Sequence, residues 1–152
     1  MRALTQEEIL KVVKKNIWAT IITVRSDGVP YAIEATPFET ETETCFMINP
    51  NGTTARNLKT SDHVLLKYTM ASGDLEEWIG ISCLGTGRFV HEKDEIVEGW
   101  RLLGLVLGLD FSSAADRFAK TPERSPMLAV KVHQRTGRCS FRPGEAVPEK
   151  YV

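Results

Sequence analysis

The residues best suited to bind a ligand lie in one short stretch, Asn49 to Asn57, which reads Asn-Pro-Asn-Gly-Thr-Thr-Ala-Arg-Asn. The stretch joins the end of a predicted strand to the start of a predicted short helix. Backbone N–H groups at a helix N-terminus point outward, and the helix dipole favours an anion there. Thr53, Thr54 and Arg56 add hydroxyl and guanidinium donors. The pattern indicates a phosphate site, although an ordinary helix capped by Thr53, with a solvated arginine, would show it as well.

A helix and three strands are predicted before this stretch. Thr5 and Glu8 have the spacing of a capping box, which indicates a helix that runs to about Lys15. The predicted strands span residues 17–24, 30–38 and 44–49, with a glycine turn between the first two. The three strands are expected to form a meander, and the third strand leads into the stretch from Asn49 to Asn57.

The predicted elements after the stretch are again mostly strands. They are strands over 63–70, 76–90, 127–133 and 138–141, a helix over 94–107 and a shorter helical patch at 114–119. The long strand over 76–90 is expected to bend at Gly85 and Gly87. A turn at Thr136-Gly137 is expected to separate the last two strands.

Short strands in sequential hairpins, with helices confined to the connections, predict a mainly β fold with peripheral helices. We expect a six- to seven-stranded antiparallel barrel, whose edges must close or be covered in a dimer. Residues 1–143 are predicted to form a single domain, and residues 144–152 a loosely held C-terminal tail.

Composition excludes several classes of partner. The 152 residues carry 19 basic and 20 acidic side chains, so no positive field is available for nucleic acid or an anionic membrane. No apolar segment is long enough to cross a bilayer, and the N-terminus does not have the pattern of a secretory signal. Cys45, Cys83 and Cys139 are far apart and odd in number, which favours buried thiols in the cytoplasm over disulfides or a metal site.

Several short motifs, in this order and spacing, resemble those of a known family. They are Trp18-Ala19-Thr20-Ile21-Ile22-Thr23-Val24, Asp27-Gly28-Val29-Pro30-Tyr31, Thr36-Pro37-Phe38, Arg56-Asn57-Leu58 and His63-Val64-Leu65-Leu66. Together they resemble the pyridoxamine 5′-phosphate oxidase-like flavin-binding split barrels over about residues 4–141. The resemblance implies a Greek-key split barrel that forms a homodimer, with two FMN sites that each draw residues from both subunits.

The resemblance also implies where the FMN lies. One strand would pass its backbone along the isoalloxazine ring, the end of the next strand would line the same pocket, and the short helix would hold the phosphate. Independently of the resemblance, aromatic faces stack well, so Trp78 is a candidate to flank the ring from the partner subunit, with packing in the core or at the dimer interface as the alternative. The predicted cofactor-binding residues are Ala35, Thr36, Pro37, Ile48, Asn49, Thr53, Thr54, Arg56, Asn57 and Trp78. No catalytic side chain and no metal ligand is implied.

Two features depart from the family pattern. Thr53-Thr54 stands where the family often has a basic pair, which removes charge from the phosphate site. The sequence after Thr136 lacks the Arg-x-His arrangement of the vitamin B6 oxidase, so the chain is more similar to the smaller relatives, including nitroimidazole reductases.

The predicted function is that of an FMN-dependent oxidoreductase, which passes hydride or electrons between a reduced nicotinamide or other donor and a small-molecule acceptor. The alternative is a non-catalytic protein that binds flavin or haem. FAD and haem are less favoured cofactors than FMN. A haem would require His63, His91 or His133 as its ligand.

Overall fold

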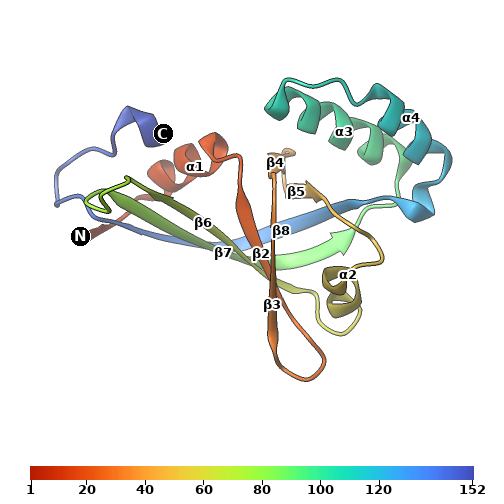
Figure 1. Cartoon of the computed structure of the whole chain (residues 1–152), viewed down its shortest axis with the longest axis horizontal. Helices are drawn as coiled ribbons and strands as arrows, with labels where there is room; N and C mark the ends of the chain where they lie inside the picture. Colours follow the sequence, from red (N-terminus) through yellow and green to blue (C-terminus); the bar gives the residue numbers. More distant parts are fainter.

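An antiparallel β-sheet forms the centre of the structure, a computed structural model that describes residues 1–152 (Figure 1). Its strands are β1 (Arg2–Ala3), β2 (Ala19–Val24), β3 (Pro30–Ala35), β4 (Phe38–Glu39), β5 (Thr44–Met47), β6 (His63–Ala71), β7 (Trp78–Phe89) and β8 (Met127–Cys139). The α-helices are α1 (Gln6–Lys15), α2 (Thr53–Leu58), α3 (Lys93–Leu107) and α4 (Ser112–Lys120). The predicted mainly β fold with helices in the connections is confirmed.

Seven strands follow one another across the sheet in the order β3-β2-β6-β7-β8-β5-β4, and β1 pairs with β8. The two edge strands, β3 and β4, are separated in sequence only by Thr36 and Pro37. Three peptide steps from Ala35 to Phe38 span at most about 11 Å. The sheet must therefore curl until its two edges meet at Thr36-Pro37.

The single strand predicted over residues 30–38 is wrong at this crossing. Ala35 is the last residue of β3 that pairs with β2, and Phe38 already pairs with Cys45 of β5. Pro37 has no N–H to continue a ladder, and the chain changes sheet edge there. The break is what splits the barrel.

The predicted turn at Thr136-Gly137 is also wrong, because both residues lie within β8 and the strand is paired with β7 from Gln134 to Cys139. Gly137 pairs with Ile81, and a Cβ on Gly137 would lie 2.8 Å from a methyl carbon of Leu4. Gly137 therefore serves close packing and not a turn. The register of the β7–β8 pair shifts between Leu84 and Gly85, where His133 of β8 is the extra residue, and the predicted bend of β7 at Gly85 and Gly87 stays a prediction.

Helix α1 begins with the predicted capping box: Thr5 Oγ1 accepts from the Glu8 amide, and the Glu8 carboxylate accepts from the Thr5 amide. At this end of the molecule the C-terminal residues lie beside α1 (Figure 1). Val147 and Tyr151 are buried there, and Lys15 Nζ donates to the Val152 carbonyl at 3.0 Å. The segment expected to be loosely held is thus packed on the domain.

Two groups of buried side chains form the core. The larger fills the curled sheet under α1, and the smaller lies under α3 and contains Phe38, Cys45, Ile96 and Leu103. All three cysteines are free and buried, and burial raises the pKa of the Cys45 thiol to about 12. None of the helices has the length and apolar character that a membrane crossing needs.

Candidate functional site

A cavity of about 360 Å³ lies between the end of β3, the end of β5 and helix α3. We call it the β3–β5 cavity. It collects four of the residues that the sequence predicted for cofactor binding, which are Ala35, Thr36, Ile48 and Asn49. Its volume falls within the range of small-molecule sites.

The break in the barrel explains why these residues meet. Strand β3 leads through Thr36 and Pro37 into β4, and β4 pairs with β5, so the ends of β3 and β5 come together. The Ile48 amide donates to the Pro126 carbonyl at 2.8 Å, which fixes the chain as it leaves β5. Pro37 is buried and lines a neighbouring cavity of about 330 Å³ instead.

Asn49 connects the β3–β5 cavity to the loop that precedes α2. Its carbonyl accepts from the Gly52 amide at 3.1 Å, and its side-chain oxygen accepts from the Asn51 amide at 2.9 Å. The Arg56 guanidinium donates to the Asn51 carbonyl at 3.0 Å and to Thr53 Oγ1 at 2.8 Å. Arg56 is therefore held against this loop while its remaining N–H groups stay available to an anion.

Helix α2 has six residues and begins after Gly52, so the predicted cap at Thr53 is wrong. The Thr53 hydroxyl accepts from Arg56 and does not bond a backbone amide of the helix. So short a helix sums few peptide dipoles. The positive charge for an anion at this loop must come from Arg56.

Thr54 and Asn57 lie on the buried side of α2. Asn57 Nδ2 donates to Thr23 Oγ1 of β2 at 2.9 Å, and both groups are buried. This bond ties the short helix to the barrel. Asn57 thus positions the loop. A contact between Asn57 and a phosphate stays a prediction.

Trp78 lies away from the β3–β5 cavity. It pairs with Ala71 at the start of β7 and lines a different cavity together with Lys67 and Arg138. Within one chain it joins none of the other predicted residues. Its expected contact with a flavin of the partner subunit stays a prediction.

The histidines also lie outside the β3–β5 cavity, and all three are exposed. His133 Nε2 is 3.0 Å from Thr86 Oγ1, and His91 Nδ1 is 3.0 Å from the Pro122 carbonyl oxygen. No group of three or more histidine, cysteine, aspartate or glutamate side chains is arranged to hold a metal ion.

Sequence reasoning missed two kinds of residue at the site. Leu103 and Leu107 of α3 line the β3–β5 cavity, and Leu103 also belongs to the buried group under α3. Trp18 directly precedes the Ala19–Ala35 pair at the end of β3, and it is 57 % exposed.

Comparison with known proteins tests the fold. No family model and no curated protein matches this chain. Solved structures do match, and three of them share its fold despite low sequence identity. The chain therefore has the split-barrel fold of the pyridoxamine 5′-phosphate oxidase-like proteins, as its sequence motifs predicted.

An FAD-binding protein from Mesorhizobium loti is 15% identical, with a TM-score of 0.70 over 91% of this chain and 96% of that one. A candidate 5-nitroimidazole antibiotic resistance protein from Bacteroides thetaiotaomicron is 12% identical, with a TM-score of 0.69 over 91% and 87%. The haem storage protein of Vibrio cholerae is 14% identical, with a TM-score of 0.64 over 85% and 90%. At these identities the likeness establishes the fold alone.

Proposed function

We propose that this chain binds a flavin in the β3–β5 cavity and acts as an FMN-dependent oxidoreductase. The observation that carries the proposal is the continuity of the site. Residues at the ends of β3 and β5 line one cavity, and Asn49 joins that cavity to the loop against which Arg56 is held. An apolar slot that leads to a cation suits a planar ring whose side chain ends in a phosphate.

The lining fits the parts of FMN. Ile48, Leu103 and Leu107 offer apolar contact to the faces of the ring. Thr36 follows the last paired residue of β3, so its backbone can hydrogen-bond the polar edge. At the other end, Arg56 and the Thr53 hydroxyl supply the phosphate donors that replace the missing basic pair.

The size of the cavity favours FMN over FAD, and its lining favours flavin over haem. About 360 Å³ is near the lower end for ligand sites, and the adenosine half of FAD would need further space. No histidine reaches the cavity, so histidine ligation of a haem is not available there. Similarity to FAD-binding and haem-storing proteins supports cofactor binding in this fold, and the cavity lining is the reason why we favour flavin as the cofactor.

We also propose that the chain forms a homodimer that covers this site. Ile17 and Trp18 are 51 % and 57 % exposed beside the strand that ends at the cavity. Adjacent exposed apolar side chains of this size typically mark an interaction surface. Sedimentation velocity should give a dimer for the wild type and a monomer for Trp18→Glu, and a wild-type monomer at micromolar concentration would contradict the dimer.

A bound flavin supplies the hydride and electron chemistry. The chain then needs only to bind and orient the ring and to keep water from one face, which Leu103 and Leu107 are placed to do. Glu34 is the one ionisable side chain that lines the cavity. This division of tasks explains why the site needs no further acid, base or nucleophile. The donor is a reduced nicotinamide or another small reductant, and the acceptor is a small molecule.

The experiment is a spectrum followed by turnover. The purified protein saturated with FMN should show flavin absorption that NADH or NADPH bleaches without oxygen, and a nitro compound or quinone should restore it. Bound flavin that neither nucleotide reduces at a useful rate would favour the alternative, a non-catalytic flavin-binding protein. Failure to bind FMN would overturn the proposal, and a haem band would replace it with haem binding.

A further inference from the structure

A further cavity, of about 550 Å³, lies over three neighbouring strands, β6, β7 and β8. It extends past the edge of β8 to the connection between β1 and α1. Its volume lies within the range of small-molecule sites. We call it the outer-face cavity. The flavin proposal uses none of its residues except Trp78, and that from the partner subunit.

Strand geometry shows which face of β7 this cavity occupies. Successive side chains of a strand point to opposite faces of the sheet, and residues 79, 81 and 83 of β7 are buried. Trp78, Gly80 and Ser82 therefore share the outer face. A Cβ on Gly80 would meet no atom within 4 Å. The backbone at Gly80 thus lies open at the centre of this face, and a ligand can approach it closely.

Two cations flank this open position. Lys67 of β6 pairs with Ser82, and Arg138 of β8 pairs with Gly80. Lys67 Nζ donates to Ser82 Oγ at 3.0 Å, which holds the ammonium group over β7. Neighbouring strands are about 4.8 Å apart, so β6 and β8 are separated by about 10 Å, and two long side chains can reach one small anion between them.

Neither Lys67 nor Arg138 forms an ion pair, and no acidic residue lines the cavity. Arg135 lines it as a third cation. Glu34, in the same row of the sheet as Lys67, is two strands away and accepts from Thr20 Oγ1 at 2.7 Å. Unpaired cations in a cavity without an acid attract an anion, and an arginine can bind a carboxylate through two parallel N–H bonds.

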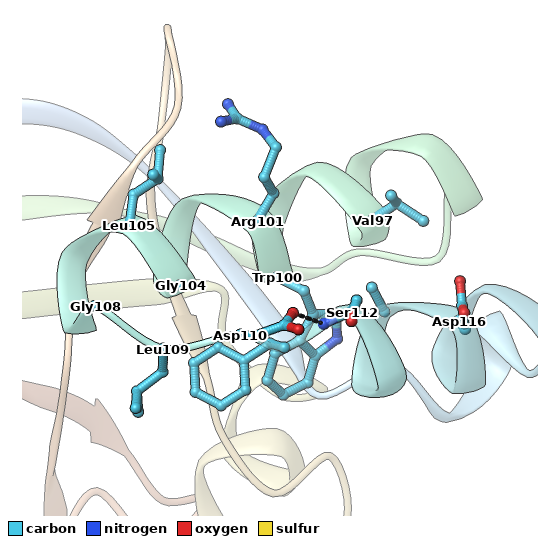
Figure 2. Close-up of a pocket in the computed structure, with 12 residues that line it drawn as sticks. Val97, Trp100, Arg101, Gly104, Leu105, Gly108, Leu109, Asp110, Ser112 and Asp116 are labelled. Atoms are coloured by element: carbon cyan, nitrogen blue, oxygen red, sulfur yellow. Dashed lines mark hydrogen bonds between the residues drawn. The ribbon is translucent and has the colours of Figure 1, made fainter.

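The larger cavity between α3 and α4, of about 660 Å³, has the opposite charge (Figure 2). Asp110 and Asp116 line it, and its one cation, Arg101, is paired with Glu98. The Asp110 carboxylate accepts from the Ser112 amide at 2.9 Å, the contact drawn in Figure 2. Negative charge repels a carboxylate. The α3–α4 cavity should therefore reject an anion that the outer-face cavity accepts.

Trp78 supplies the apolar part of the outer-face cavity. It is half-buried and lies two residues from Gly80 on the same face of β7. Flat aromatic rings stack favourably on an indole. We propose that the outer-face cavity binds a small aromatic carboxylate. Its carboxylate group lies between Lys67 and Arg138, and its ring packs against Trp78 over the open backbone of Gly80.

The test compares 4-hydroxybenzoate with 4-hydroxybenzamide, which has nearly the same shape and no charge. The chain has three tryptophans, so a two-dimensional nitrogen–proton spectrum shows three indole signals, assigned with Trp78→Phe and Trp100→Phe variants. We expect 4-hydroxybenzoate to move the Trp78 signal in a saturable way and to leave the signal of Trp100, in the α3–α4 cavity, unmoved. It should bind about tenfold more tightly than the amide, and added salt should reduce this preference.

Variants separate the charge from the open space. Lys67→Gln and Arg138→Gln each remove one cation, so each should lose most of the tenfold preference. Lys131→Gln is the matched control, because Lys131 is on β8 but lines a different cavity, and it should keep the preference. Gly80→Val fills the space over the backbone without a clash and should abolish the binding of both probes. An unmoved Trp100 signal in each variant would show that it is folded.

Four results would overturn the proposal. One is a Trp78 signal that 4-hydroxybenzoate does not move. The second is equal affinity for the two probes, or a preference that survives in both Lys67→Gln and Arg138→Gln. The third is loss of 4-hydroxybenzoate binding on saturation with FMN, because the two ligands would then share one site. The fourth is a Trp78 signal that shifts with protein concentration alone, which would mean that a second copy of the chain covers the cavity.

Discussion

Removing the side chain of Arg56 should weaken the binding of FMN far more than the binding of riboflavin, which lacks the phosphate. The guanidinium has five N–H groups, of which one reaches the Asn51 carbonyl and one reaches Thr53 Oγ1. The others can meet a phosphate at the same loop. A hydrogen bond to a charged group contributes about 1.5–3 kcal/mol, and the exposure of Arg56 places it at the lower end.

At about 1.5–2 kcal/mol, Arg56→Ala should raise the dissociation constant of FMN roughly 10- to 30-fold. The assay is a fluorescence titration of FMN and of riboflavin with the wild type and the variant. Riboflavin should bind both proteins within about twofold, since it cannot use the lost donor. Arg25→Ala is the matched control, because Arg25 is an exposed arginine paired with Asp27 in the β2–β3 turn.

Equal weakening of both flavins would refute the reasoning, since Arg56 would then support the fold of the loop and not the phosphate. An unchanged dissociation constant for FMN would place the phosphate elsewhere. In either case circular dichroism at 222 nm would show whether the variant had kept its structure.

Three further predictions concern stability. Arg2 donates two hydrogen bonds to the Glu8 carboxylate, which lowers the pKa of Glu8 from 4.5 to about 2. Because folding lowers this pKa, the ionised Glu8 carboxylate stabilises the folded state above pH 4.5, and the stabilisation is lost as the pH falls toward 2. Glu8→Gln should therefore lower the free energy of unfolding in urea by about 1–2 kcal/mol at pH 7 and by much less at pH 2.5. A loss of stability that does not depend on pH would contradict this. Asn57→Ala leaves the Thr23 hydroxyl buried without its partner and should lower the free energy of unfolding by about 1–3 kcal/mol, whereas Lys59→Ala, on the exposed side of the same segment, should change it by less than about 0.5 kcal/mol. Gly137→Val should lower the thermal midpoint by the equivalent of about 1–3 kcal/mol, because its side chain has no room under the β1–α1 segment, and an unchanged midpoint would show that this packing is loose.

Local patterns in the sequence were sufficient for most of the elements. The capping box at Thr5 and Glu8 and the alternation in the strands act within a few residues, so they are visible without tertiary contacts. The predictions failed at positions whose structure depends on contacts with residues far away in the sequence. Gly137 looks like a turn residue, but a glycine is needed there because Leu4 and Ile9, from the other end of the chain, leave no room for a side chain. The break at Thr36-Pro37 likewise depends on the pairing of β4 with β5.

The candidate site was likewise predictable from the sequence only in part. Ala35, Thr36, Ile48 and Asn49 were implied by the family resemblance, and the structure brings them into one cavity. Leu103 and Leu107 were missed because an apolar helical stripe does not tell which surface it covers. The inward side of α2 could not be predicted either. The direction of Asn57 depends on a hydroxyl 34 positions earlier in the chain.

The most direct measurement is the quenching of FMN fluorescence as protein is added, for the wild type and for a variant with the β3–β5 cavity filled. Thr36→Trp places an indole in the cavity, and Ser113→Trp on the exposed side of α4 is the control. We predict saturable binding of one FMN per chain to the wild type and to Ser113→Trp, and loss of binding in Thr36→Trp. Saturable binding to all three proteins would mean that the flavin lies elsewhere, and binding to none of them would contradict the account.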